Sequence, residues 1–405
     1  MRRSSSLLTR LAGVAAGVVL AAAAVLVAAL PAQAATLTQV TGFGSNPGNL
    51  AMYAYRPDGL PANSPAVVLL HGCTQNASTY FTNSGWQKYA DQWKFALIVP
   101  QQPSANNANS CFNWFETGDT ARGQGEALSV KQMVDYAKAN YSVDGSRVFV
   151  SGLSAGAAMS AVMLATYPDV FAAGSVIAGL PYRCATSMTN AFTCMNPGVD
   201  KTPAQWGDLV RNAYAGYTGK RPRVAIWHGT SDTTVAPLNA AESRDQWTNV
   251  LGVSQTPTST ASLPAGTSLE VYGSDQVRLY RVSGMGHGTP VDPGSAADQC
   301  GTAGAYFLDT ICSTYRDALF FGLDGGGGTP SPTPTATASP TPSPSPTSAP
   351  VCVTASNYAH VTAGRAYQSG GYAYALGSNQ RMGLYNTFYT STLKQTGPSY
   401  WVIGC

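Results

Sequence analysis

The chain has 405 residues, of which 44% are hydrophobic and 11% charged, and its formal net charge at pH 7 is +3. This length accommodates one large domain and a smaller one. The small net charge argues against nucleic acids and anionic membranes as partners, because proteins that bind either are usually strongly basic.

Residues 1–34 have the organisation of a signal peptide. Three arginines fall within the first ten residues, an apolar run extends over residues 11–30, and Ala32-Gln33-Ala34 supplies the small residues of a cleavage site. The apolar run is long enough to cross a bilayer, so an uncleaved membrane anchor is the alternative. The cleavage pattern favours removal, and we expect a secreted, extracellular protein with no stable membrane association.

Residues 35–324 carry the pattern of a single α/β domain. Continuous apolar runs at residues 66–70 and 95–99 are typical of buried parallel strands. Apolar residues at helical spacing predict an amphipathic helix around residues 130–137. Further strands are expected at residues 148–150, 174–178, 224–227 and 277–282, and a buried helix at residues 155–165. Strands that alternate with helices indicate a mostly parallel sheet covered by helices.

The pentapeptide Gly152-Leu153-Ser154-Ala155-Gly156 lies between one of these strands and the buried helix. A Gly-x-Ser-x-Gly sequence between a strand and a helix is the signature of a nucleophile elbow, in which small neighbours permit a sharp turn. An ordinary strand-to-helix turn is the alternative. We predict that Ser154 is the nucleophile of a serine esterase.

A serine nucleophile needs a general base, and histidine suits this role at neutral pH. The chain has four histidines: His71, His228, His287 and His360. His287 is the preferred base because it stands in a glycine-rich loop directly after the strand at residues 277–282, where such a fold places its base. A solvated loop histidine is the alternative.

The acid that orients the base should lie between Ser154 and His287, because serine, acid and histidine follow in this order in such folds. Asp232 comes directly after the end of a predicted strand, which suits this role. Asp208 and Asp245 occur in helix-like stretches and are less suitable.

Acyl transfer also needs hydrogen-bond donors for the developing oxyanion. The expected donors are the backbone N–H groups of Ala155, directly after the nucleophile, and of Cys73, in the loop after the first predicted strand. A plain strand-end turn is the alternative for the Cys73 loop. Trp114, Phe115 and Tyr182 lie in loops near strand ends and are candidates to line the acyl site, although core packing accounts for them equally well. This chemistry needs no cofactor or metal.

Eight cysteines follow the expected cleavage site, and an even number in an exported protein suggests disulfides. Pairing of sequence neighbours gives Cys73–Cys111, Cys184–Cys194, Cys300–Cys312 and Cys352–Cys405. The chain has no Cys-x-x-Cys or His-x-x-x-His spacing, so we expect no zinc site.

The composition changes abruptly at Gly325. Residues 325–350 begin with four glycines and continue with Pro among Thr, Ser and Ala, which predicts an extended linker. Residues 351–405 hold nine aromatic residues and no Asp or Glu, and their glycine and aromatic content favours a small β-rich module.

Several segments of the chain resemble extracellular poly(3-hydroxybutyrate) depolymerases with a type 1 catalytic domain: residues 71–77, 152–159, 227–232 and 286–291. Two later segments, residues 357–366 and 382–386, resemble the polyester-binding module of such enzymes. The resemblance implies an α/β-hydrolase fold and hydrolysis of short-chain polyhydroxyalkanoates through an acyl-enzyme, with Ser154, Asp232 and His287 as the triad. It also implies an insoluble polyester surface as the partner of residues 351–405.

Two other functions stay open. An esterase of plant cell-wall polysaccharide, such as a feruloyl or acetylxylan esterase, would have a similar catalytic fold, and tyrosines of the last segment would then stack on sugar rings. A secreted binding protein on an inactive hydrolase scaffold is the second alternative, against which the complete set of Ser154, Asp232 and His287 argues. We expect the protein to be a monomer.

Overall fold

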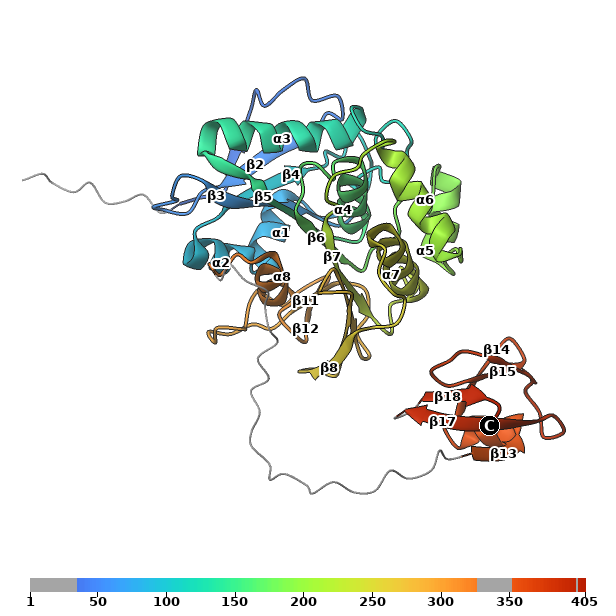
Figure 1. Ribbon diagram of the computed structural model, residues 1–405. Helices are drawn as coiled ribbons and strands as arrows, with labels where there is room; N and C mark the ends of the chain where they lie inside the picture. The colour runs from blue at the N-terminus through green and yellow to red at the C-terminus, as the bar shows by residue number, and fades with distance from the viewer. Residues whose placement is uncertain (1–34, 326–351, 398–399) are drawn as a thin grey trace, which may run out of the picture. The chain divides into compact units, whose positions relative to one another are not determined.

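The computed structural model of the protein describes residues 35–325, 352–397 and 400–405 (Figure 1). The expected signal peptide and all of the expected linker except Gly325 lie outside the described residues. The described residues form two compact units that the linker separates in sequence. Within the described residues, no helix has both the length and the apolar character that crossing a bilayer requires.

The framework of the first unit is a ten-stranded sheet made of β1 (Thr38–Val40), β2 (Ala51–Tyr55), β3 (Ser64–Leu70), β4 (Ala96–Gln101), β5 (Val143–Leu153), β6 (Ala173–Ile177), β7 (Arg223–Gly229), β8 (Ser259–Leu263), β9 (Thr267–Tyr272) and β10 (Val277–Val282). The strand order is β1-β2-β4-β3-β5-β6-β7-β10-β9-β8. The six central strands, in the order β4-β3-β5-β6-β7-β10, pair in parallel with their neighbours. The outer strands at both edges pair antiparallel.

Helices cover both faces of this sheet (Figure 1). One face carries α3 (Gly125–Tyr141), α4 (Ala155–Thr166), α6 (Pro203–Ala213) and α7 (Leu238–Leu251), and the other carries α1 (Ala77–Ser84), α2 (Trp86–Trp93) and α8 (Ser313–Phe321). Side chains of a strand point alternately to the two faces. Val68 of β3 therefore belongs to one core with Met133 of α3, and Leu69 belongs to the other core with Trp86 of α2.

The predicted fold class is confirmed, because a mostly parallel sheet between helices is the α/β-hydrolase architecture. The predicted strands correspond to β3, β4, β5, β6, β7 and β10, and the predicted helices to α3 and α4. β5 is longer than expected, since it begins at Val143. The short helix α5 (Met188–Met195) belongs to neither main core and packs instead in a third cluster with Trp114 and Ala155.

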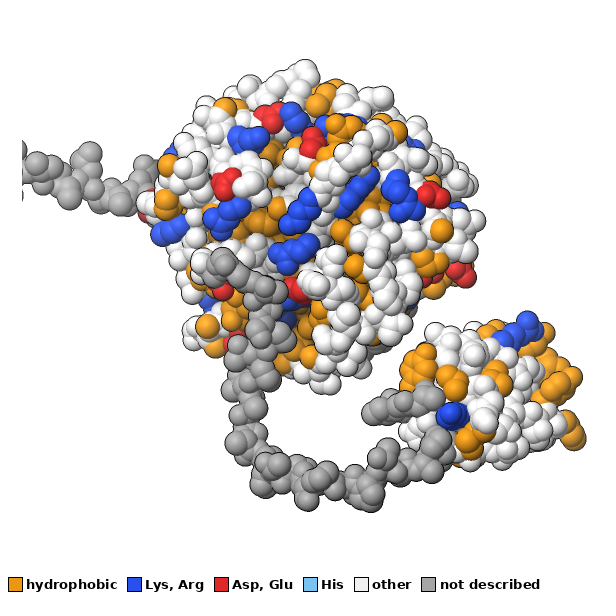
Figure 2. All heavy atoms as spheres, in the orientation of Figure 1, with side chains coloured by type: hydrophobic (Ala, Val, Ile, Leu, Met, Phe, Trp, Pro, Cys, Tyr) orange, Lys and Arg blue, Asp and Glu red, His pale blue; other side chains and the backbone are white. Residues whose placement is uncertain are grey.

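The second unit is β-rich, as predicted, with one short helix that the sequence did not indicate, α9 (Asn357–Thr362). One sheet has the order β13-β17-β18 and the other β14-β15-β16. Their strands are β13 (Cys352–Ser356), β14 (Ala366–Ser369), β15 (Tyr372–Ala375), β16 (Arg381–Leu384), β17 (Thr390–Gly397) and β18 (Tyr400–Ile403). The core is small and includes Ala373, Leu393 and Trp401. Figure 2 shows hydrophobic side chains over several parts of this unit's visible face and no acidic side chain there.

All eight cysteines are paired in the nearest-neighbour pattern predicted from the sequence. The disulfides are Cys73–Cys111, Cys184–Cys194, Cys300–Cys312 and Cys352–Cys405. Each of them joins two segments of the same unit. Cross-links of this kind compensate for the little core that a small unit such as the second can bury.

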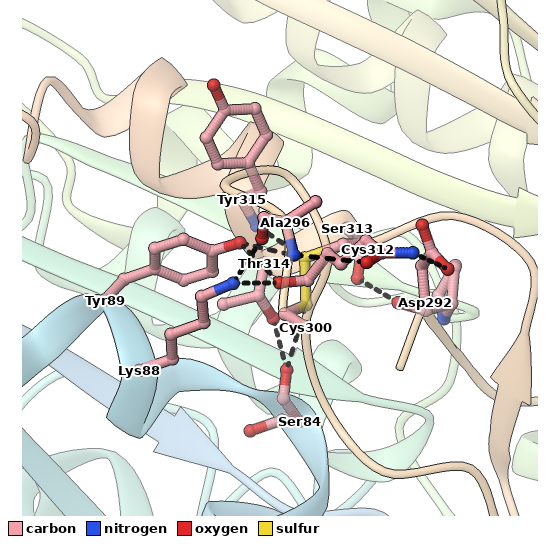
Figure 3. The surroundings of a disulfide bond; sticks show 12 residues. Ser84, Lys88, Tyr89, Asp292, Ala296, Cys300, Cys312, Ser313, Thr314 and Tyr315 are labelled. Atoms are coloured by element: carbon pink, nitrogen blue, oxygen red, sulfur yellow. Dashed lines mark hydrogen bonds between the residues drawn. A yellow bond between two sulfur atoms is a disulfide. The ribbon is translucent and has the colours of Figure 1, made fainter. Parts of the chain in front are cut away.

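The Cys300–Cys312 disulfide lies where the chain after β10 is anchored to α2 (Figure 3). This chain contains β11 (Thr289–Val291), which pairs in parallel with β12 (Phe307–Asp309). The Lys88 ammonium of α2 donates to the carbonyl oxygens of Ala296 and Gln299 at 2.5 and 2.6 Å. The loop-rich segment downstream of β10 is thus tied to the helix layer.

Candidate active site

Ser154 occupies the turn between β5 and α4, in a strained backbone conformation. Its φ is 56° and its ψ is -117°, values that a non-glycine residue keeps only when its surroundings enforce them. A Cβ on Gly156 would lie 2.1 Å from the carbonyl oxygen of Leu70, and one on Gly152 would lie 2.5 Å from the carbonyl oxygen of Gly156. Only glycines therefore fit this strand–turn–helix geometry. Ala155 begins α4, so its N–H has no partner within the helix.

Asp232 and His287 follow β7 and β10 and form a hydrogen-bonded pair. His287 Nδ1 lies 2.7 Å from Asp232 Oδ2. The two strands are parallel neighbours, so the loops at their carboxyl ends lie side by side. The other carboxylate oxygen, Oδ1, accepts hydrogen bonds from the backbone N–H groups of Thr234 and Val235, both at 2.9 Å. The carboxylate is thus held in one orientation, with Oδ2 facing the imidazole.

The Asp232 carboxylate is buried, and its environment keeps it ionised. Burial raises its pKa, but the hydrogen bond and charge of His287, together with the Val235 amide, hold the pKa below the usual value of an aspartic acid. An ionised carboxylate at Oδ2 keeps the imidazole proton on Nδ1. His287 Nε2 is then free to accept a proton from a hydroxyl group.

A second histidine, His228, supports the turn that carries Asp232. Its Nε2 lies 2.8 Å from the carbonyl oxygen of Val235 and 3.5 Å from Asp232 Oδ2. Burial lowers the pKa of His228, so the ring is neutral and its Nε2–H donates to the Val235 carbonyl. The sequence gave no signal of the contact between His228 and Val235, because this contact depends on how the turn after β7 folds back.

Cys73 lies in the loop after β3 and lines the same pocket as Ser154. The N–H of Gly72 donates to Gln75 Oε1 at 2.9 Å, and the disulfide to Cys111 ties the loop to a distant segment. Both constraints restrict the direction of the Cys73 N–H. A fixed donor of this kind is what an oxyanion site requires.

His71 adds a third constraint on this loop, instead of serving as a base. Its Nε2 accepts a hydrogen bond from the N–H of Gln102 at 3.1 Å, and its Nδ1–H donates to the carbonyl oxygen of Gly72 at 2.8 Å. Burial lowers the pKa of His71 to about 4, so the ring stays neutral. The Gly72 carbonyl and the Cys73 N–H belong to one planar peptide group. The bond to His71 therefore also orients the Cys73 N–H.

A pocket of about 360 Å³ is lined by Ser154 and His287 and by two of the three expected acyl-site residues. Trp114 and Phe115 line it, with their rings packed edge to face at a centroid distance of 5.4 Å. Tyr182 does not belong to the lining, and the expectation for it is corrected. Its ring is buried in the core on the α3 and α4 side of the sheet. Its hydroxyl donates to the carbonyl oxygen of Thr120 at 3.3 Å, which gives this aromatic a structural role.

The pocket brings together the groups that acyl transfer uses. They are a serine hydroxyl at a strained turn, an imidazole held by a carboxylate, and backbone N–H donors beside the serine. Across the described ranges, no group of three or more His, Cys, Asp or Glu side chains is arranged to hold a metal ion.

Comparison with known proteins places the chain among esterases. The family model for esterase PHB depolymerases matches residues 49–270, a range that includes Ser154 and Asp232. The chain is 58% identical over 309 residues to poly(3-hydroxyalkanoate) depolymerase C of Paucimonas lemoignei, which covers 75% of this chain and 74% of that protein. It is 41% identical over 267 residues to feruloyl esterase B of Thermothelomyces thermophilus, which covers 64% of this chain and 90% of that protein.

A solved structure matches the first unit. The acetyl xylan esterase from Aspergillus awamori aligns with a TM-score of 0.62 and 32% identity, covering 71% of this chain and 99% of that chain. The names of these proteins specify different esters.

Proposed function

We propose that this chain, which belongs to the esterase PHB depolymerase family and is an ester hydrolase, is a secreted enzyme. It cleaves poly(3-hydroxybutyrate)-type polyesters by a Ser-His-Asp mechanism. The observation that carries the proposal is the Asp232–His287 hydrogen bond of 2.7 Å beside a pocket that Ser154 also lines. The choice of polyester is supported by the 58% identical relative, whose name specifies a poly(3-hydroxyalkanoate).

The first half-reaction transfers an acyl group to Ser154. The serine oxygen attacks the ester carbonyl carbon while His287 Nε2 accepts the hydroxyl proton. The N–H groups of Cys73 and Ala155 donate to the negatively charged oxygen of the tetrahedral intermediate. When the intermediate collapses, the imidazolium returns the proton to the departing oxygen, which leaves as the hydroxyl end of the polymer.

The second half-reaction releases the acyl group. Water attacks the ester bond of the hydroxyacyl-enzyme, and His287 Nε2 accepts the water proton and then protonates the oxygen of Ser154. The ionised Asp232 carboxylate stabilises the imidazolium in both halves. Trp114 and Phe115 border the acyl chain, which suits a short aliphatic group because both rings are apolar.

The second unit is proposed to hold the enzyme on insoluble polyester. Its exposed aromatic residues include Phe388, which is 90% exposed, and Tyr389, which is 53% exposed, and it has no acidic residue. Contact with a neutral polymer removes exposed apolar side chains from water, and this burial favours binding. Tethering also raises the local concentration of ester bonds around the pocket.

Secretion is supported by the complete pairing of the cysteines, because disulfides form and persist in oxidising compartments.

The proposal is tested by incubating the full-length protein and a Ser154→Ala variant with a polyhydroxybutyrate suspension and with feruloylated xylan. We expect the wild type alone to release hydroxybutyrate. Release of ferulate or acetate without clearing of the polymer would support a carbohydrate esterase instead. Absence of Ser154 labelling by a fluorophosphonate would support a binding protein on an inactive scaffold.

A further inference from the structure

The described residues of the first unit expose four large apolar side chains, and three of them line the pocket. Met188, Phe192 and Tyr306 are 47%, 66% and 45% exposed and belong to the pocket lining, whereas Leu238 does not. A side chain that lines a pocket and also faces solvent stands at the pocket mouth. Single exposed apolar side chains are common, but a group of them around one opening marks a contact site.

These three side chains, which we call the docking rim, come from two segments. Met188 and Phe192 are four residues apart on α5 and therefore share one face of the helix. Tyr306 precedes β12, and its ring meets the His287 ring edge to face at a centroid distance of 6.2 Å. The docking rim thus reaches from α5 to the immediate neighbourhood of His287.

The α5 part of the docking rim is fixed in place. The Cys184–Cys194 disulfide ties the end of α5 to the segment before it. The side-chain amide of Asn239 donates to the carbonyl oxygens of Cys194 and Met195 at 3.0 and 3.2 Å. The apolar side chains are therefore presented to solvent by an anchored helix.

The pocket lining matches an uncharged substrate. Its described residues include no Asp, Glu, Lys or Arg, so contact with a neutral surface would remove no side-chain charge from water. A polysaccharide presents many hydroxyl groups, which lose hydrogen bonds to water when they meet Met188 and Phe192. A polyester presents alkyl groups next to its ester carbonyls and suits such a rim better.

We infer that the docking rim rests on the surface of solid polyester and aligns the pocket with the chains exposed there. The inference rests on the proposed function and deepens it, because it gives the second unit and the docking rim different roles at the polymer surface. The second unit holds the enzyme at the solid, and the docking rim sets the orientation in which a chain segment reaches Ser154. Adsorption and hydrolysis of the solid then become separable properties.

The test compares full-length variants on soluble and solid substrates. Phe192→Gln and Met188→Gln make the docking rim polar, and Phe192→Leu keeps it apolar. Thr193→Gln is the matched control, because Thr193 is exposed on the same helix and does not line the pocket. Each protein is assayed for hydrolysis of 4-nitrophenyl butyrate, hydroxybutyrate release from polyhydroxybutyrate particles, hydrolysis of emulsified triacylglycerol, and adsorption to the particles.

We expect the ratio of solid to soluble hydrolysis to fall about tenfold in Phe192→Gln, as losing the burial of one large apolar side chain predicts. The ratio should fall in Met188→Gln as well, and stay near wild type in Phe192→Leu and Thr193→Gln, with adsorption retained throughout. An unchanged ratio, or an equal loss on both substrates, overturns the inference. A loss confined to triacylglycerol overturns it in favour of a lipid surface. A wild type that cleaves only the soluble ester defeats the proposed function itself.

Discussion

Replacing Asp232 with asparagine tests the proposed triad, because the structure dictates how the new side chain must lie. Two backbone N–H groups, those of Thr234 and Val235, donate to Oδ1. An asparagine must place its carbonyl oxygen there, since an NH₂ group would face two donors. Its NH₂ group then occupies the position of Oδ2, 2.7 Å from His287 Nδ1 in the wild type.

An NH₂ group in that position donates to His287 Nδ1 and moves the imidazole proton to Nε2. The base then carries a proton on the nitrogen that should accept one from Ser154. We expect kcat of Asp232→Asn to fall by about 10⁴-fold, which corresponds to about 5 kcal/mol of activation free energy. KM should change little, because the substituted side chain is buried behind His287 and does not line the pocket.

The assay is steady-state hydrolysis of 4-nitrophenyl butyrate, with circular dichroism to confirm folding. Asp245→Asn is the control, because Asp245 is an acidic residue of α7 that pairs with Arg244 and lies outside the pocket lining. Its kcat should stay within a few-fold of wild type. A loss below about tenfold in Asp232→Asn would refute the tautomer argument, since a wrong tautomer removes the general base altogether.

Three further predictions concern stability and adsorption. Replacing Cys73 and Cys111 together with alanine removes a cross-link across 38 residues, and chain entropy puts the loss of unfolding free energy at about 4 kcal/mol. Urea denaturation of the oxidised wild type and the double variant checks this, and equal midpoints would contradict it. Burial raises the pKa of Glu126 to about 8, so above the unfolded pKa the native state retains a proton that the unfolded chain has released. As the pH rises from roughly 5 to 7, the unfolding free energy of the wild type should therefore fall, relative to that of Glu126→Gln, by about 1.4 kcal/mol per pH unit. Urea titrations at several pH values measure this, and parallel plots of unfolding free energy against pH for the two proteins would count against a buried, protonated carboxyl. Replacing Phe388 and Tyr389 with serine should weaken adsorption to polyhydroxybutyrate particles about tenfold, measured by depletion from solution, and undiminished adsorption would mean that another face of the second unit binds.

The central part of the fold was predictable because burial on both faces leaves a plain signal in the sequence. β3 is buried at every position, and its residues 66–70 form an unbroken apolar run. The edge strands carry no such run: β1 is Thr38-Gln39-Val40, and its first two residues are exposed. Pairing with a neighbour, and not composition, makes such a segment a strand. The same reason applies to β8, whose residues are exposed or only partly buried.

The site was predictable where its chemistry is local. The sharp turn at Ser154 was predictable because the glycines on either side are a steric requirement of that turn. The proximity of Asp232 and His287 was predictable because each follows a strand, and the carboxyl ends of parallel strands meet at one edge. Tyr182 could not be assigned correctly, since its role depends on Thr120, which lies far away in sequence. The docking rim was missed for the same reason, because α5 reaches the pocket only through tertiary packing.

The nearest-neighbour pattern of the disulfides bears on how such chains can be assembled and exchanged. Cys352 and Cys405 are the first and last described residues of the second unit, and the other six cysteines pair inside the first. A recombination event that breaks the gene within the linker would therefore leave every cysteine with its own partner. The second unit therefore forms its disulfide independently of the first. A hydrolase can acquire, lose or exchange this unit without leaving any cysteine unpaired.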